Sequence, residues 1–335
     1  MALLAVASCT APESTRETTV ELDHVTAVVM PFLTQMPFHI AQEEGYFEQE
    51  GIEVEFVRVG RSQELMAALA RGEVDAVAGL LTVNELNTMA SGVRVRVVAS
   101  LAELDPDECT FLAMIASKGL QASGALEDPE QVRELVIDTD QLTPLGYQVD
   151  VLLRRYGLGI DDVELINLPP PAGLGAIRSG SVDAILENEP FLTRHLEADT
   201  STIWAPAEEL TPGYPHSILI FGERLLDERP EVAERFAVAL LRGIRQFREG
   251  KTARNMELVQ QASGLEVDLL ERACWPVAPP EAQVNTDAIR GYQEWSVERG
   301  LMNRVVEDDE LVDRRFLEAA ARTLDERARA MEASQ

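Results

Sequence analysis

The sequence contains few lysines, cysteines and aromatic residues, and these shortages exclude several classes of function. Its only lysines are Lys118 and Lys251, and its formal net charge is −29. A surface of this charge repels nucleic-acid phosphates and anionic lipid head groups, so we expect no nucleic-acid partner. The acidity is typical of an adaptation for solubility in salt, and attraction of a cationic ligand is the other interpretation.

The three cysteines, Cys9, Cys109 and Cys274, form neither a CxxC motif nor a cluster with histidine. The sequence therefore predicts no metal site. For Cys109 and Cys274 we expect two buried free thiols rather than a disulfide. Sequence motifs of serine hydrolases, zinc proteases and phosphate-binding loops are also missing, and no cofactor is predicted.

The first nine residues are apolar, then small, and end on a cysteine. Val6-Ala7-Ser8-Cys9 resembles the lipobox of bacterial lipoproteins, in which the cysteine is acylated. Residues 10–19 are polar and typical of a flexible tether. The basic region and long apolar core of a signal peptide are cut short, so an ordinary frayed terminus is the alternative. No other stretch approaches the ~18 apolar residues of a membrane span, so a lipid on Cys9 would be the only membrane attachment.

The length of 335 residues and the hydrophobic content of 46% suffice for two cores. Apolar strands alternate with helices, which predicts an α/β fold with mostly parallel sheets and right-handed crossovers. The predicted strands are 25–30, 52–59, 74–78, 93–101, 111–116, 135–137, 163–168, 182–186 and 217–221. The predicted helices are 37–48, 64–71, 144–156, 173–179, 232–247, 253–261, 267–273, 286–299 and 311–330, and the last five are expected to pack on the first lobe.

One phrase occurs twice, roughly a hundred residues apart, which indicates two similar lobes. Residues 68–77 are echoed by residues 176–185: each copy ends a helix, continues through a glycine and enters a strand through Val-Asp-Ala. A glycine at this point suits the left-handed conformation that ends a helix. The predicted domains are 1–21 (leader and tether), 22–104 (first part of lobe one), 105–210 (lobe two) and 211–335 (completion of lobe one and C-terminal helices).

The run PFHIAQEEGYFEQEGIEV, residues 37–54, is the most specific motif in the chain. It resembles the opening of the family of binding proteins for nitrate, sulfonates, taurine and thiamine-pyrimidine precursors. Residues 72–76 and the pair Glu189-Pro190 also match, and the resemblance covers residues 22–247. It implies a type II periplasmic-binding-protein clamp that traps a small-molecule ligand. It also implies an extracytoplasmic lipoprotein, monomeric, with ABC permease and ATPase subunits as partners.

Ligands of open α/β sheets bind at the carboxyl ends of the strands. This rule predicts the following ligand-binding residues: Thr34, Gln35, Arg61, Ser62, Gln63, Leu81, Thr82, Asp140, Thr143, Pro170 and Glu189. Arg61 and Ser62 begin a helix and suit an anion, although they can also be a solvated side chain and a helix cap. The acidic Asp138, Asp140 and Glu189 suit an amine or ring N–H, although turn or hinge roles are the alternative. The charge of the ligand therefore stays open.

Aromatic residues near the predicted cleft have two interpretations. Tyr147 and Trp204, together with Phe32 and Phe38, are candidates for stacking on a flat ligand, and core packing is the more common role. Enzymes that share the implied fold are the alternative to a binding protein. Pyrimidine-synthase-like enzymes use a reactive lysine and a cysteine-rich motif, which this sequence lacks, and chorismate-dehydratase-like enzymes lack a leader. We therefore expect a protein without enzymatic activity.

Overall fold

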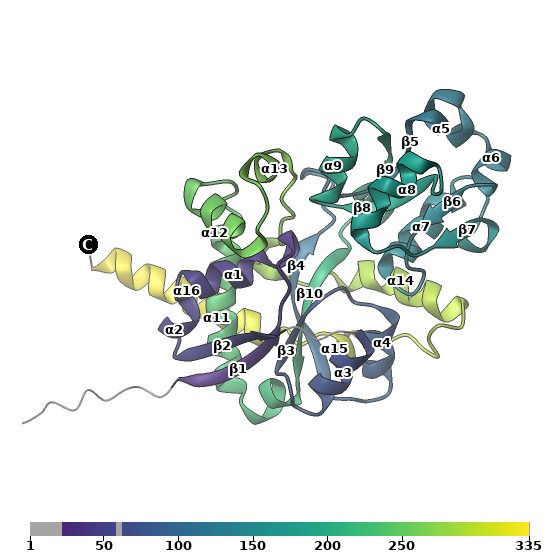
Figure 1. Cartoon of the computed structure of the whole chain (residues 1–335). Coiled ribbons are helices and arrows are strands. Elements are labelled where there is room, and N and C mark those ends of the chain that lie inside the picture. Colours follow the sequence, from purple (N-terminus) through teal and green to yellow (C-terminus); the bar gives the residue numbers. More distant parts are fainter. Residues whose placement is uncertain (1–21, 58–61, 335) are drawn as a thin grey trace, which may run out of the picture.

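The computed structural model describes residues 22–57 and 62–334 and folds into two lobes (Figure 1). Each lobe contains a five-stranded sheet flanked by helices. The strands of the first sheet are β1 (Asp23–Val28), β2 (Ile52–Val57), β3 (Ala76–Gly79), β4 (Val95–Glu103) and β10 (Pro215–Gly222). Those of the second are β5 (Leu112–Ser117), β6 (Val136–Asp138), β7 (Glu164–Ile166), β8 (Ala184–Asn188) and β9 (Ser201–Pro206).

The two sheets share one topology. Their strand orders are β2-β1-β3-β10-β4 and β7-β6-β8-β5-β9. In the first sheet β1 pairs in parallel with β2 and β3, whereas β10 is antiparallel to β3 and β4. The second sheet repeats this scheme, with β6 in the place of β1 and β5 in the place of β10. Each sheet is therefore mixed, and the chain crosses between the lobes after β4 and after β9.

The repeated phrase of the sequence occupies equivalent positions in the two lobes. Gly72 and Gly180 both have a positive φ, of 68° and 72°, and each follows a helix. The aspartate of each Val-Asp-Ala accepts a backbone N–H from the neighbouring strand at 2.9 Å: Asp75 from Thr26 and Asp183 from Val136. The repeated phrase thus forms the same local structure in both lobes: a glycine ends the helix, and an aspartate holds the next strand beside its neighbour.

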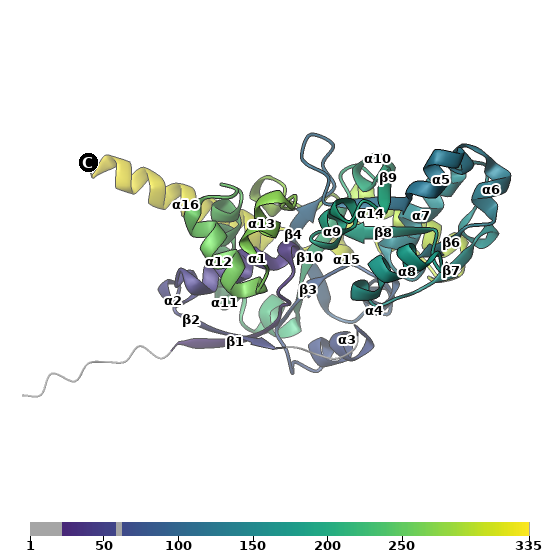
Figure 2. The same ribbon diagram turned by 45° about the horizontal axis from the view of Figure 1, so that its top comes forward.

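The helices cover both faces of the sheets (Figure 2). The first lobe contains α1 (Met36–Glu43), α2 (Tyr46–Gln49), α3 (Ser62–Ala70) and α4 (Val83–Ala90). The second contains α5 (Lys118–Ser123), α6 (Pro129–Arg133), α7 (Pro144–Arg154), α8 (Gly173–Ser179), α9 (Phe191–Glu197) and α10 (Ala207–Leu210). The C-terminal region contains α11 (Pro230–Phe247), α12 (Ala253–Ser263), α13 (Val267–Arg272), α14 (Thr286–Glu298), α15 (Asp308–Leu311) and α16 (Arg315–Ala333).

Two parts of the C-terminal region contact the second lobe as well as the first, which differs from the predicted packing on the first lobe. From α14, the Tyr292 hydroxyl donates to the carbonyl of Leu142 at 3.0 Å, and Arg299, just after the helix, pairs with Asp161 at 2.7 Å. From α13, Arg272 pairs with Glu197 of α9. An apolar stripe identifies a helix that packs, but it does not say which surface the helix covers.

Cys109 and Cys274 form a disulfide, so the expectation of two free thiols is wrong. Their Cα atoms lie 5.8 Å apart although 165 residues separate them in the sequence. Cys109 lies in the segment that crosses from β4 to β5, and Cys274 lies just after α13. Spacing along the chain carries no information on this proximity, because it arises from the packing of the C-terminal region against the crossing segment.

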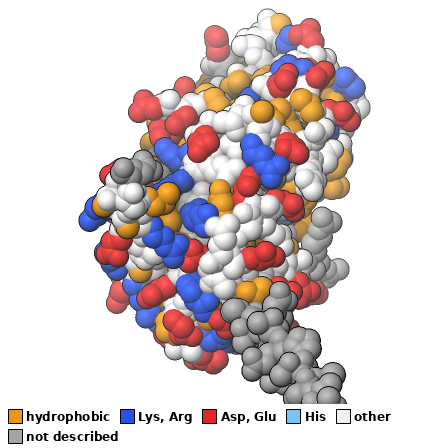
Figure 3. Space-filling view, turned by 90° about the vertical axis from the view of Figure 1, so that its left-hand side faces the viewer, with side chains coloured by type: hydrophobic (Ala, Val, Ile, Leu, Met, Phe, Trp, Pro, Cys, Tyr) orange, Lys and Arg blue, Asp and Glu red, His pale blue; other side chains and the backbone are white. Residues whose placement is uncertain are grey.

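Acidic and basic side chains are interspersed on the face that contains α2, α12 and α16, despite the strongly negative net charge (Figure 3). Glu50, at the end of α2, is buried and pairs with Arg327 of α16 at 2.9 Å. Arg254 of α12 pairs with Glu44 at 2.7 Å. Arginines thus attach the C-terminal helices to the first lobe, and the acidic excess is carried by the remaining carboxylates.

Candidate functional site

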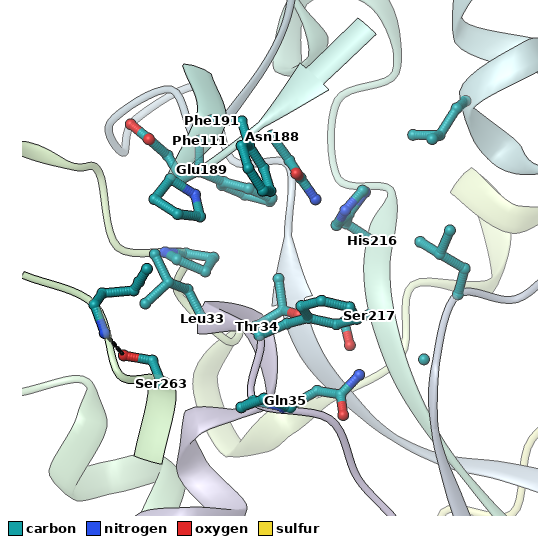
Figure 4. Close-up of a pocket in the computed structure, with 18 residues that line it drawn as sticks. Leu33, Thr34, Gln35, Phe111, Asn188, Glu189, Phe191, His216, Ser217 and Ser263 are labelled. Atoms are coloured by element: carbon teal, nitrogen blue, oxygen red, sulfur yellow. Dashed lines mark hydrogen bonds between the residues drawn. The ribbon is translucent and has the colours of Figure 1, made fainter. Parts of the chain in front are cut away.

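A cavity of about 330 Å³ lies between the lobes, at the carboxyl ends of β1, β3 and β8. This is the edge at which open α/β sheets bind ligands, and the volume falls within the ~300–1,000 Å³ of small-molecule sites. The lining residues are Pro31, Phe32, Leu33, Thr34, Gln35, Gly79, Leu80, Phe111, Leu145, Asn188, Glu189, Pro190, Phe191, His216, Ser217, Ser263, Leu265 and Pro276. Figure 4 shows Phe111, Asn188, Glu189 and Phe191 facing Leu33, Thr34 and Gln35 across it.

Three of the residues predicted to bind ligand line this cavity: Thr34, Gln35 and Glu189. Thr34 and Gln35 belong to a short 3₁₀ turn between β1 and α1. The Gln35 carboxamide is buried, accepts the N–H of Met30 at 2.7 Å and donates to the carbonyl of Ala78 at 3.4 Å. Gln35 therefore holds the loop after β1 against the end of β3 and shapes the floor of the cavity.

The Glu189 carboxylate is already hydrogen-bonded within the protein. It accepts the Thr193 hydroxyl at 2.8 Å, the Thr193 N–H at 3.1 Å and the Cys274 N–H at 3.0 Å. Burial raises the pKa of Glu189, and these hydrogen bonds act in the opposite direction. This geometry gives Glu189 a structural role, because it ties the turn between β8 and α9 to the segment after α13.

Other predicted site residues lie away from the cavity lining. Leu81 is in the core, and Thr82 caps α4 by accepting the Asn84 N–H at 3.2 Å. Thr143 caps α7, and Asp140 accepts the Leu142 N–H at 3.0 Å. Arg61 and Cys9 lie outside the described residues, as do the side chains of Ser62, Gln63 and Pro170. The ligand-binding roles predicted for these residues, and the lipidation predicted for Cys9, stay predictions.

The aromatic candidates divide between the core and the cavity. Tyr147 packs against Trp295, with ring centroids 5.7 Å apart, and Trp204 donates its indole N–H to Tyr156 at 2.9 Å. Phe38 is fully buried in the first lobe. Phe32, in contrast, is 58% exposed and lines the cavity. Core packing thus accounts for three of the four candidates.

His216 and Ser217, at the start of β10, are functional candidates that the sequence did not predict. They are only 3% and 2% exposed, and both line the cavity. Their Nδ1 and Oγ atoms have no hydrogen-bond partner among the described residues. Burial lowers the pKa of His216 to about 4, so its imidazole is neutral at pH 7. The ring of Phe111 contacts it edge-on at 5.4 Å.

The described lining of the cavity contains no lysine or arginine, and Glu189 is its only carboxylate. Within residues 22–57 and 62–334, no group of three or more His, Cys, Asp or Glu side chains is arranged to hold a metal ion. In the same ranges no helix is both long and apolar enough to cross a bilayer. The cavity can therefore provide apolar contact and hydrogen bonds, but its described walls provide no positive charge.

A sequence model of the NMT1-like family matches residues 19–263, which is well over half of the chain. The chain belongs to the NMT1-like family. Over 227 residues this NMT1-like chain is 25% identical to the nitrate import ATP-binding protein NrtC of Synechocystis. The match covers 63% of the chain but 33% of that relative, so the chain spans about a third of its length.

Solved structures confirm the predicted fold and the resemblance. The alkanesulfonate-binding protein SsuA from Xanthomonas axonopodis pv. citri, bound to MOPS, matches with a TM-score of 0.68 at 16% identity, covering 87% of this chain and 98% of that one. The periplasmic nitrate-binding protein NrtA from Synechocystis matches with a TM-score of 0.69 at 13% identity, covering 91% of this chain and 89% of that one. The desulfurization enzyme DSZB matches with a TM-score of 0.62 at 14% identity, covering 90% of this chain and 99% of that one. At these identities the matches establish the type II periplasmic-binding-protein fold of the NMT1-like chain and not its activity.

Proposed function

We propose that the chain is the substrate-binding component of an ABC importer, which captures a small organic molecule or anion and delivers it to permease and ATPase subunits. The cavity between the lobes carries this proposal, because residues of both lobes line it and, in the described part of the chain, the segments after β4 and after β9 connect the two sheets. The relative named for nitrate import and the solved alkanesulfonate- and nitrate-binding proteins support it. We infer that the protein acts as a monomer.

The proposed mechanism is closure of the two lobes around the ligand. A ligand that contacts Thr34 on one lobe and Asn188 on the other makes both sets of contacts only in the closed form, so binding shifts the equilibrium toward that form. The ion pairs Arg272–Glu197 and Arg299–Asp161 join α13 and the end of α14 to the second lobe. An opening that moves the second lobe away from α13 and α14 would lengthen these two contacts.

An enzyme on the same fold is the alternative, since DSZB shares it. Nucleophilic catalysis needs an activated nucleophile, such as a serine hydrogen-bonded to a base. In the described part of the cavity there is no cysteine or lysine, and the Ser217 hydroxyl has no hydrogen-bonded base. These observations favour binding without chemistry.

A thermal-shift screen of residues 20–335 tests the binding function. Its library comprises sulfonates, nitrate, bicarbonate, aminopyrimidines, flavin, polyamines and aromatic carboxylates. A ligand at a hundred times its Kd adds about 2.7 kcal/mol to the free energy of unfolding, which raises the Tm by several degrees. We expect at least one compound to do so and to be recovered chemically unchanged.

Recovery of an altered compound would favour the enzyme, and a library without any stabilising compound would count against the proposal. The stabilising compound then serves for small-angle scattering. Closure predicts a smaller radius of gyration at saturating ligand, and an unchanged radius would contradict the clamp mechanism.

We propose an extracytoplasmic, lipid-anchored location. The disulfide between Cys109 and Cys274 supports it, because such bonds persist in oxidising compartments and are rare in the cytosol. The lipobox-like Val6–Cys9 supplies the candidate attachment site, although these residues lie outside the described ranges.

Lipidation predicts that the full chain, expressed in a bacterium, fractionates with membranes and has an intact mass increased by acyl groups. The Cys9→Ser variant should stay in the soluble fraction at its unmodified mass, because it lacks the acylated thiol. Thr10→Ser is the matched control, since it changes the residue next to Cys9 and keeps both the cysteine and the disulfide. Equal fractionation of wild type and Cys9→Ser would exclude the anchor.

A further inference from the structure

Two buried polar atoms at one side of the cavity lack partners. These are His216 Nδ1 and Ser217 Oγ, which have no hydrogen-bond partner within the described chain. Buried polar groups are hydrogen-bonded in more than about 90% of cases, and leaving one unpaired is unfavourable. Both residues line the cavity, but the two atoms are themselves almost completely buried, so a ligand reaches them only when the Ser217 hydroxyl or the His216 ring rotates toward the cavity. In Figure 4 they lie across the cavity from Leu33 and Glu189.

These two atoms suit a polar group that carries no charge. A neutral imidazole offers one donor and one acceptor nitrogen, and a serine hydroxyl can donate or accept. Burial keeps His216 neutral at pH 7 by lowering its pKa to about 4. A ligand anion would find no lysine or arginine in the described lining, and the one carboxylate there, Glu189, is already hydrogen-bonded to Thr193 and to the Cys274 N–H. Burying an unpaired charge in these surroundings is strongly unfavourable.

The rest of the cavity suits an apolar body. Phe32, Phe111 and Phe191 present three aromatic rings, and Leu33, Leu80 and Leu265 add aliphatic surface. Such a wall gains most from a flat ring, because aromatic contacts add to the burial of apolar area. The cavity volume of about 330 Å³ accommodates one or two fused rings.

We propose that the cavity binds an uncharged ring compound with one amide-like end, which hydrogen-bonds to His216 and Ser217. This inference rests on the proposed binding function and specifies its ligand class. It distinguishes the chain from the structural relatives that bind alkanesulfonate and nitrate, whose ligands are anions.

Three probes with the same ring system test the proposal: naphthalene-2-carboxamide, naphthalene-2-carboxylate and naphthalene-2-sulfonate. Calorimetric titration of the wild-type protein at pH 7 should give a Kd for the carboxamide at least tenfold lower than for either anion. Ser217→Ala should weaken carboxamide binding about threefold to tenfold, because it removes one neutral hydrogen bond. His216→Phe keeps an aromatic ring and should weaken it by a similar factor.

Ser100→Ala is the matched control. Ser100 is a fully buried serine on the neighbouring β4 and is outside the cavity lining, so its replacement should leave the Kd unchanged. Equal or tighter binding of either anion would overturn the ligand class and leave the binding function standing. Carboxamide binding that is insensitive to Ser217→Ala would overturn the assignment of the polar end. Failure of all three probes would overturn the inference, and the broader thermal-shift screen decides the binding function separately.

Discussion

Replacing Cys109 and Cys274 together with serine should lower the free energy of unfolding by about 2–5 kcal/mol. The bond joins the crossing segment after β4 to the residue that follows α13, across a sequence separation of 165. A cross-link over so long a loop removes many conformations of the unfolded chain, so its loss favours unfolding. Urea unfolding of oxidised wild type and of the double variant at pH 7 measures the difference.

Single variants provide the control for this prediction. Cys109→Ser and Cys274→Ser break the same bond, so each should be destabilised about as much as the double variant rather than by half. The Cys274 N–H that donates to Glu189 is a backbone group and stays in place in every variant. Reduction of the wild type should reproduce the loss of stability. A wild type that is unaffected by reductant and binds a thiol reagent at Cys109 would show that the bond does not form.

The alternation of strands and helices could be predicted because it is a local property of the sequence. β1 and the helix α8 lie where their apolar patterns placed them, within a few residues. Other elements depend on tertiary contacts. Helix α4 has only eight residues and depends on its Thr82 cap and on burial of Leu86 and Met89. The edge strand β9 exists through its pairing with β5, which no local pattern reveals.

The site was predicted in part, for a reason that lies in the sheet topology. The rule that ligands lie at the carboxyl ends of parallel strands led to Thr34, Gln35 and Glu189. It cannot lead to His216 and Ser217, because β10 runs antiparallel to β3 and reaches the cavity with its first residues. The direction of β10 depends on where the chain returns from the second lobe. Only the assembled sheet shows that the start of this strand lies beside the end of β3.

Between pH 6.5 and pH 4 the free energy of unfolding of the wild type should fall by about 3 kcal/mol more than that of a variant without the His216 imidazole. Burial lowers the pKa of His216 from 6.5 to about 4. In this range the unfolded chain binds a proton at residue 216 and the folded chain does not. Acidification therefore favours unfolding, and the contribution is fully present above pH 6.5 and lost as the pH falls toward 4.

Comparison with His216→Phe isolates this contribution, because other buried groups titrate in both proteins. Burial raises the pKa values of Glu189, Asp138 and Glu103, so acidification stabilises the fold through these carboxyls, and that effect cancels between the two proteins. Urea unfolding at several pH values between 7.5 and 4 gives the two curves. They should diverge as the pH falls, with the wild type losing more stability. Parallel curves would mean that the folded chain protonates His216 as readily as the unfolded chain, and the case for an uncharged ligand end at this residue would fail with it.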